Sequence, residues 1–238
     1  LMVIILIVLM LVNCGGNAPS GGDKPDDEEK PGVESQSDEQ QQDVASDTPG
    51  APANASESFG NYIEAKGELI GIITDALTNN PGTELDSVSL LGVTMVDMAL
   101  LPASSFGLGQ EAAITTLGLL GAEDVVYSEN GNQYSVKYRG AEGEQFELKG
   151  VYDKAADALK CTSFKDGKEG LISEHRKTSF GYVGQVYAIN EDGSTYVYQL
   201  AISGKDGGVG ISEASTAPPE LTGNETIDFP KQCKEWYA

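Results

Sequence analysis

The sequence predicts an α+β fold in which N-terminal helices pack on one face of a C-terminal antiparallel β-meander of up to eight strands. Before residue 121, apolar residues recur at steps of three and four, which is typical of amphipathic helices. Beyond it they recur at steps of two, which is typical of strands with one buried face. Turn signals such as Asn130-Gly131 and Asp166-Gly167 recur at short intervals, and such short connections join antiparallel neighbours.

Three helices are expected ahead of the strands. The apolar face of the first consists of Phe59, Tyr62, Ile63, Lys66, Leu69, Ile70, Ile73, Ala76 and Leu77, and Asn79-Asn80-Pro81-Gly82 ends it. The second, over 84–101, is apolar almost all round. Because it contains Asp86 and Asp97, we expect a central buried helix rather than a membrane span. The third is expected over 110–120 and ends at Gly121.

Eight strands are expected in the second half of the chain. Tyr134, Val136 and Tyr138 alternate with polar residues and therefore share a face. The expected strands are 122–128, 132–139, 144–152, 157–165, 168–177, 180–190, 194–203 and 206–213. The residues from Ala214 onward, which include Pro218-Pro219, are expected to form a loop-like tail.

The chain opens with an uninterrupted apolar run, Leu1 to Val12, that leads to Cys14. The run matches the core of a secretory signal peptide and is shorter than the roughly 20 residues that span a bilayer. Leu11-Val12-Asn13-Cys14 resembles the lipobox of bacterial lipoproteins, although Asn13 replaces the usual small residue. The resemblance implies a signal peptide over 1–13 and lipidation of Cys14. Because the first residue is not Met, a positively charged leader is expected ahead of it.

Residues 14–58 are expected to form a disordered acidic spacer behind the lipid anchor, and residues 59–238 a single globular domain. Val33 and Val44 are the only large apolar residues of the spacer. Such a segment cannot bury enough apolar surface to offset the entropy lost on ordering.

The chain of 238 residues carries 37 acidic and 15 basic residues and a formal charge of −22. This balance excludes nucleic acid as an expected partner, because phosphate binding needs clustered Lys and Arg. It also disfavours electrostatic attachment to anionic lipid, so the anchor is expected to supply attachment to the extracytoplasmic face of the cell membrane. We expect a monomer with an envelope or extracellular partner whose identity the sequence leaves open.

The cysteines other than Cys14 are Cys161 and Cys233. An even number of cysteines in an exported domain makes a disulfide between them a candidate. The alternative is two buried free thiols. Cys161 alternates with Leu159 on an inward face, where a thiol usually serves as packing.

The sequence predicts no catalytic residue, metal site or cofactor. His175 is the only histidine, which excludes sites with two imidazoles, and its polar neighbours predict a surface position. The segment Gly107-Leu-Gly109-Gln-Glu-Ala112 fits a dinucleotide-binding pattern, but no strand is expected before it. Neither Gly-x-Ser-x-Gly nor Ser-x-x-Lys occurs.

Three classes of function remain open. The leading one is a non-enzymatic, surface-tethered binding or envelope-associated module that works through its sheet. The others are a carrier that encloses an apolar ligand and an envelope hydrolase with two carboxylates facing each other in a cleft. Tyr182 and Tyr187 are the candidate binding surface, because their opposite parity requires one of them to be exposed. Tyr196 and Tyr198 are expected in the core.

Four segments of the globular domain carry a further resemblance: Gly150-Val151-Tyr152-Asp153, Leu159-Lys160-Cys161, Gly181-Tyr182-Val183-Gly184-Gln185 and the Phe-Pro-x-x-Cys-x-x-Trp-Tyr ending. Through them most of the domain is similar to uncharacterised lipoproteins from Clostridium-like Gram-positive bacteria. The resemblance implies an extracytoplasmic location and carries no activity.

Overall fold

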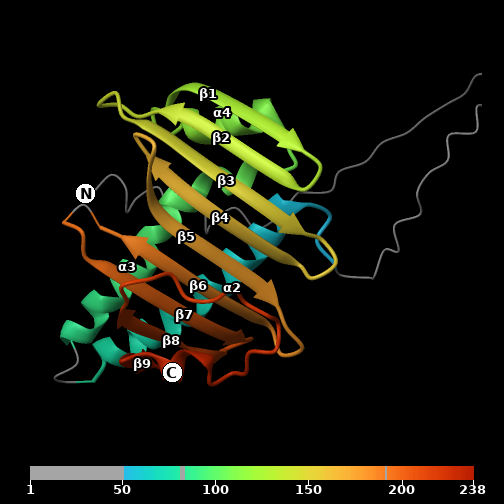
Figure 1. The fold of residues 1–238 in the computed structure, drawn as a ribbon. Coiled ribbons are helices and arrows are strands. Elements are labelled where there is room, and N and C mark those ends of the chain that lie inside the picture. The colour runs from blue at the N-terminus through green and yellow to red at the C-terminus, as the bar shows by residue number, and fades with distance from the viewer. Residues whose placement is uncertain (1–50, 81–83, 191) are drawn as a thin grey trace, which may run out of the picture. The chain divides into compact units, whose positions relative to one another are not determined.

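The order of helices and strands in the computed structural model confirms the predicted α+β class. The structure describes residues 51–80, 84–190 and 192–238. In Figure 1 the helices lie on one face of a single antiparallel sheet, whose strands follow the order β1 to β9. The helical elements are α2 (Ala55–Thr78), α3 (Glu84–Leu100), the short 3-10 helix η1 (Leu101–Ser105) and α4 (Gln110–Gly118).

Each strand of the meander pairs with the next one along the chain. The strands are β1 (Glu123–Asn130), β2 (Gln133–Arg139), β3 (Gln145–Asp153), β4 (Ala158–Lys165), β5 (Lys168–Lys177), β6 (Tyr182–Ile189), β7 (Thr195–Ser203), β8 (Asp206–Glu213) and β9 (Glu235–Tyr237). The first eight match the predicted strands closely. The ninth lies in the tail that was expected to be loop-like, and it pairs with Val209, Gly210 and Ile211 of β8.

Helix α2 connects the helical layer to the sheet. Its first turn is capped by Asn54, whose side-chain oxygen accepts a hydrogen bond from the Glu57 amide at 2.9 Å. The helix therefore starts at Ala55, inside the predicted spacer and before the predicted start at Phe59. The predicted signal peptide, Cys14 and most of the predicted spacer lie outside the described residues.

Helix α3 is not the central helix that its apolar composition suggested. One side packs on α2 and the sheet, whereas Leu91 and Met95 on another side are 57% and 51% exposed. Lys66 of α2 joins the two helices, since its amine donates hydrogen bonds to Val93 O at 2.7 Å and Asp97 Oδ1 at 2.5 Å. None of the described helices combines the length and hydropathy that crossing a bilayer requires.

The face of the sheet opposite the helices is covered over β6 to β8. Val183 and Ala201 on that face form a small apolar cluster with Leu221 and Phe229 of the C-terminal segment. A Cβ added to Gly210 would come within 2.3 Å of the Pro230 carbonyl oxygen, so the tail packs directly on the backbone of β8. This part of the sheet is therefore buried on both faces.

One side chain bonds to two backbone groups on the outer edge of β1. Gln110, the first residue of α4, donates from Nε2 to Val125 O at 2.7 Å, and its Oε1 accepts from the Tyr127 amide at 2.7 Å. The carboxamide thus occupies the place that a peptide group of a neighbouring strand would take.

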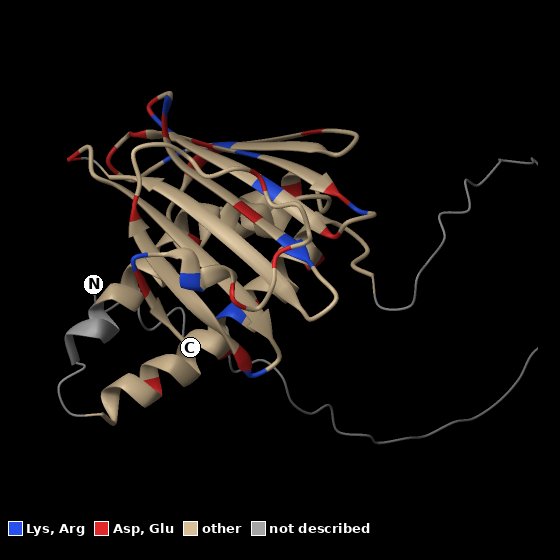
Figure 2. Ribbon diagram, turned by 60° about the horizontal axis from the view of Figure 1, so that its bottom comes forward, with Lys and Arg blue, Asp and Glu red and all other residues tan. Residues whose placement is uncertain are grey.

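Charged residues are unevenly distributed between the two layers. Figure 2 shows acidic and basic positions spread over the strands and hairpin turns, while the helix ribbons carry few of them. From Ser89 to its end at Leu100, α3 has a single charged residue, Asp97. This part of α3 therefore offers mainly apolar and small polar side chains to anything that lies beside it, whereas the exposed side of α2 carries Glu57, Glu64, Glu68 and Asp75.

Candidate functional site

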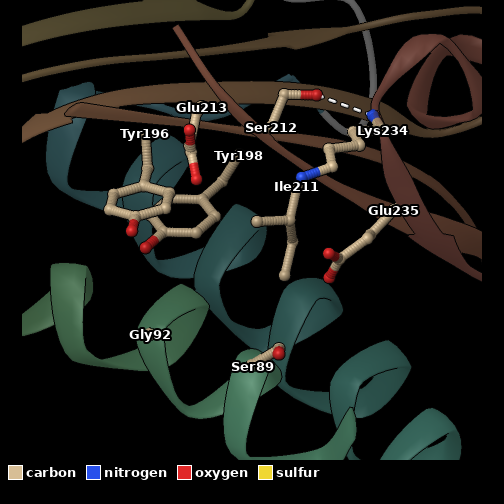
Figure 3. A pocket seen from close by; sticks show the side chains of 9 residues that line it. All are labelled: Ser89, Gly92, Tyr196, Tyr198, Ile211, Ser212, Glu213, Lys234 and Glu235. Carbon is tan, nitrogen blue, oxygen red and sulfur yellow. Dashed lines mark hydrogen bonds between the residues drawn. The ribbon is translucent and has the colours of Figure 1, made fainter. Parts of the chain in front are cut away.

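The candidate site is a groove of about 390 Å³ between α3 and the last strands of the sheet (Figure 3). Ser89 and Gly92 of α3 form one wall, and the facing wall comes from β7 and β8. The segment around β9 forms the rim. A concave site lined by aromatic groups and a few polar groups is the usual form of a small-molecule binding site.

Two tyrosines dominate the sheet side of the groove. Tyr196 and Tyr198 are two residues apart on β7, so their side chains project from the same face. Their rings are parallel within 9°, with 6.5 Å between centroids. Both are half-buried. The prediction that they belong to the core was right about the face and wrong about full burial, because α3 does not cover this end of β7 completely.

Gly92 allows Tyr198 to approach α3. A Cβ at this position would lie 3.0 Å from the Tyr198 hydroxyl oxygen, closer than a side chain normally tolerates. Glycine in a helix interior costs about 1 kcal/mol relative to alanine. Burial raises the pKa of the Tyr198 hydroxyl, which keeps it neutral at physiological pH.

The rim of the groove carries three charged side chains. Glu235 is the cross-strand partner of Ile211, and Glu213 is two residues beyond Ile211 on the same face of β8. Diagonal neighbours of this kind are roughly 7 to 8 Å apart, with their Cβ atoms somewhat closer. In Figure 3 the Lys234 side chain extends toward Ile211, while its backbone amide donates to Ser212 Oγ at 2.7 Å.

This arrangement suits binding better than acid-base catalysis. Glu213, Lys234 and Glu235 are all exposed to solvent. A carboxyl group acts as a general acid near neutral pH when its surroundings desolvate it, as in glycosidases. The groove does bring two carboxylates to one opening, but it leaves both in contact with water.

A second polar cluster lies in the interior between α2 and the sheet. Ser58 donates to Asp157 Oδ1 at 2.5 Å, and its Oγ lies 3.1 Å from His175 Nε2. The Tyr62 ring stacks on the imidazole at 4.4 Å between centroids. The three residues combine the side-chain types of a hydrolase triad, but the serine here lies between the histidine and the aspartate, and all three are buried.

His175 is therefore buried, and its predicted surface position was wrong. It points toward the helices, and Tyr62 covers it. Burial lowers its pKa to about 3, so the imidazole is neutral. The neighbouring Glu174, on the other face, is also buried, because its carboxylate accepts a hydrogen bond from the Leu221 amide at 3.0 Å.

The tyrosines of the predicted binding surface point to opposite faces, but neither is exposed. Tyr182 faces the helices and is 7% exposed, and Tyr187 faces the other way and is 8% exposed. Ala217 and Pro218 of the C-terminal segment line a small cavity together with Tyr187. The prediction that one of the pair is exposed was wrong, because this segment covers the second face of β6.

The structure does not bring the two remaining cysteines together. Cys161 is a buried free thiol on the helix side, and Cys233 is a partly buried free thiol on the other side, where it donates to Gln199 Oε1 at 3.4 Å. Three strand spacings, roughly 14 Å, separate β4 from β7. A disulfide requires Cα atoms within about 7 Å, so the candidate bridge is not formed in this structure.

Within residues 51–80, 84–190 and 192–238, no three His, Cys, Asp or Glu side chains are grouped so that they would hold a metal ion. Comparison with protein-family models, with curated proteins and with solved structures gave no match.

Sequence reasoning missed the rim of this groove. Glu213, Lys234 and Glu235 come from the end of β8 and from a tail without regular alternation. The one available signal was Glu235-Trp236-Tyr237, where two aromatic residues favour a strand. Nothing in the sequence indicates that this strand pairs with β8.

Proposed function

We propose that this protein is a lipid-anchored, extracytoplasmic, non-enzymatic binding module that takes a small ligand in the groove between α3 and β7 to β9. The observation that carries the proposal is the parallel pair Tyr196 and Tyr198, half-buried in a groove of about 390 Å³. Two such rings give a ligand apolar contact area at low cost in conformational entropy, because each has two rotatable side-chain bonds.

The shape of the groove favours a binding module over a carrier. An apolar carrier encloses most of its ligand, whereas this groove is open along a rim of charged residues. A ligand with an apolar part and a polar part matches such a site, because the tyrosines contact the first and the rim contacts the second.

The anchor is part of the proposal. Cys14 follows closely after the apolar run of the signal-like segment, and acylation of its thiol would hold the module at the outer face of the membrane. Intact mass measurement of protein purified from its native membrane tests this point. We expect a chain that begins with acylated Cys14, and a mature chain that retains residues 1–13 would contradict it.

Binding in the groove can be tested with 2-naphthol, a neutral flat aromatic probe. Chemical shifts of the purified protein are expected to move at Tyr198 and Ile211 as the probe is added. The variants Tyr196→Ser and Tyr198→Ser should each weaken binding about tenfold, since each removes one aromatic wall.

The matched control is Tyr138→Ser, which removes a half-buried tyrosine that packs on Phe146 near the opposite edge of the sheet. If this control weakens binding as much as the groove variants do, the effect comes from stability and the groove is not the site. Shift changes confined to β1 to β3 would likewise place binding elsewhere.

A further inference from the structure

We propose that the ligand of this groove is an organic ammonium ion, with its charged nitrogen between Glu213 and Glu235 and its apolar part on Tyr196 and Tyr198. This inference rests on the proposed function of the groove and names the chemical class that the site selects.

The two carboxylates define the position of the charge. Glu213 and Glu235 project from the same face of neighbouring strands and are diagonal neighbours, since Glu235 lies opposite Ile211 and Glu213 lies two residues beyond it. Diagonal neighbours are roughly 7 to 8 Å apart, with their Cβ atoms somewhat closer, which leaves room for one ammonium group to contact both carboxylates. A primary ammonium has three donors and no acceptor, which matches a pair of carboxylates. An anion at the same place would meet two like charges.

The tyrosines add a second attraction of the same sign. The face of an aromatic ring carries negative electrostatic potential and attracts a cation within about 6 Å of its centroid. This chain already makes such contacts: Lys177 Nζ lies 3.9 Å from the centroid of Tyr182, and Lys231 Nζ lies 5.2 Å from that of Trp236. In the groove, Tyr196 and Tyr198 offer the same surface to a ligand.

The charge of the whole chain acts in the same direction. A formal charge of −22 raises the local concentration of cations near the protein and lowers that of anions. Long-range attraction of this kind increases the association rate and is screened by salt. Binding of an ammonium ligand is therefore expected to weaken as ionic strength rises.

The positive charge of Lys234 should affect the binding of cations and of anions in opposite directions. Among the described residues that line the groove, Lys234 is the only basic one, and its side chain extends toward Ile211 (Figure 3). An ammonium ligand has to share this space with a like charge. Removing the charge of Lys234 should therefore strengthen the binding of a cation, whereas it would weaken the binding of an anion.

Three probes of similar size and different charge test the inference on the purified full chain: phenethylamine, 2-phenylethanol and phenylacetate. Isothermal titration should show phenethylamine binding about tenfold more tightly than 2-phenylethanol, and phenylacetate binding weakest. Each of Glu213→Gln and Glu235→Gln should weaken phenethylamine binding about fivefold and leave 2-phenylethanol unchanged. Lys234→Gln should tighten phenethylamine binding about threefold.

Glu142→Gln in the turn between β2 and β3 is the matched control for loss of one negative charge. It should leave all three affinities unchanged. An equal loss of phenethylamine binding in this variant would show that the overall charge, and not the rim, attracts the ligand, and would overturn the assignment of the ammonium site.

The remaining outcomes separate the ligand class from the proposed function. If 2-phenylethanol binds as tightly as phenethylamine and Tyr198→Ser weakens both, the groove binds ligands but the ammonium class is wrong. If phenylacetate binds best and Lys234→Gln weakens it, the class is likewise wrong. If none of these probes and no 2-naphthol binds, both the class and the proposed function fail.

Discussion

The Ser58 hydroxyl oxygen and His175 Nε2 lie 3.1 Å apart, although 117 residues separate them in the chain. Because the hydroxyl proton is directed to Asp157, the histidine must carry its proton on Nε2 and donate it to Ser58. The contact joins the first turns of α2 to β5 and to the turn before β4. It satisfies three polar side chains that the fold places out of reach of water.

His175 should make the folded state sensitive to acid. Its pKa is lowered to about 3 by burial, below the value near 6.5 expected in the unfolded chain. The unfolded state therefore binds a proton that the folded state rejects, and stability falls as the pH drops from about 6.5 toward 3. Between pH 7 and pH 5 this group should cost about 2 kcal/mol.

Urea unfolding of the wild type and of His175→Gln at both pH values checks this prediction. The glutamine side chain can still donate to Ser58 but does not titrate. The variant should lose about 2 kcal/mol less than the wild type over this interval. Equal losses would show that other groups cause the acid sensitivity.

Gly184→Ala should destabilise the protein by about 2 to 3 kcal/mol. Gly184 is the cross-strand neighbour of His175, and a Cβ there would lie 2.0 Å from the Tyr62 hydroxyl oxygen. The tyrosine would have to leave its stacked position on the imidazole. Thermal unfolding checks the prediction, with Gly170→Ala on β5 as the control, because no atom lies within 4 Å of the Cβ position there. Similar losses in both variants would contradict the steric explanation.

The loss of stability should depend on which partner of the Lys66–Asp97 ion pair is replaced. Lys66 is 1% exposed, whereas the Asp97 side chain is 24% exposed. Asp97→Asn leaves the buried Lys66 cation without its partner and should lower the free energy of unfolding by about 3 kcal/mol. Lys66→Met leaves a carboxylate that water can reach and should lower it by about 1 kcal/mol.

Replacing both partners tests the same ion pair. The double variant Lys66→Met/Asp97→Leu should lie within about 1 kcal/mol of the wild type, since apolar side chains of similar size can replace a buried pair. Chemical denaturation of the four proteins gives these values. A larger loss for Lys66→Met than for Asp97→Asn would refute the asymmetry.

The two domain cysteines should differ in reactivity. Burial raises the pKa of the Cys161 thiol to about 12, and it also raises the pKa of the partly exposed Cys233 thiol. In the folded Cys14→Ser variant, a thiol reagent should modify Cys233 before Cys161. After unfolding without reductant, the reagent should modify both thiols. If the unfolded variant has fewer than two reactive thiols, Cys161 or Cys233 is oxidised.

The sequence predicted the elements of the sheet well because each strand pairs with its neighbour in the chain. Alternation identifies a strand, and turn residues such as Asp166-Gly167 identify its end, so no long-range information is needed. The N-terminal start of α2 was less predictable. Asn54 lies in a polar stretch, and only its hydrogen bond to Glu57 distinguishes a helix cap from another spacer residue.

What the sequence could not reveal is the course of the C-terminal segment. Residues 214–232 lack a regular apolar period, yet they bury the outer face of β6 to β8 through Leu221 and Phe229. This coverage explains the wrong prediction of exposure for Tyr187. His175 is buried on the opposite face, where Tyr62 of α2 covers it. An alternating or polar strand predicts that one of its faces is in contact with solvent. Here that face of β6 to β8 is covered by a segment that has no regular apolar period.

The Gln110 carboxamide has a consequence for crowding. If the chain is anchored as proposed, neighbouring copies would lie at high local density, where an unpaired strand edge can pair with the edge of a second molecule. On β1 the Gln110 side chain already bonds to the Val125 carbonyl and the Tyr127 amide, so these two groups are not free to pair. A second copy that paired with this part of β1 would have to break both hydrogen bonds.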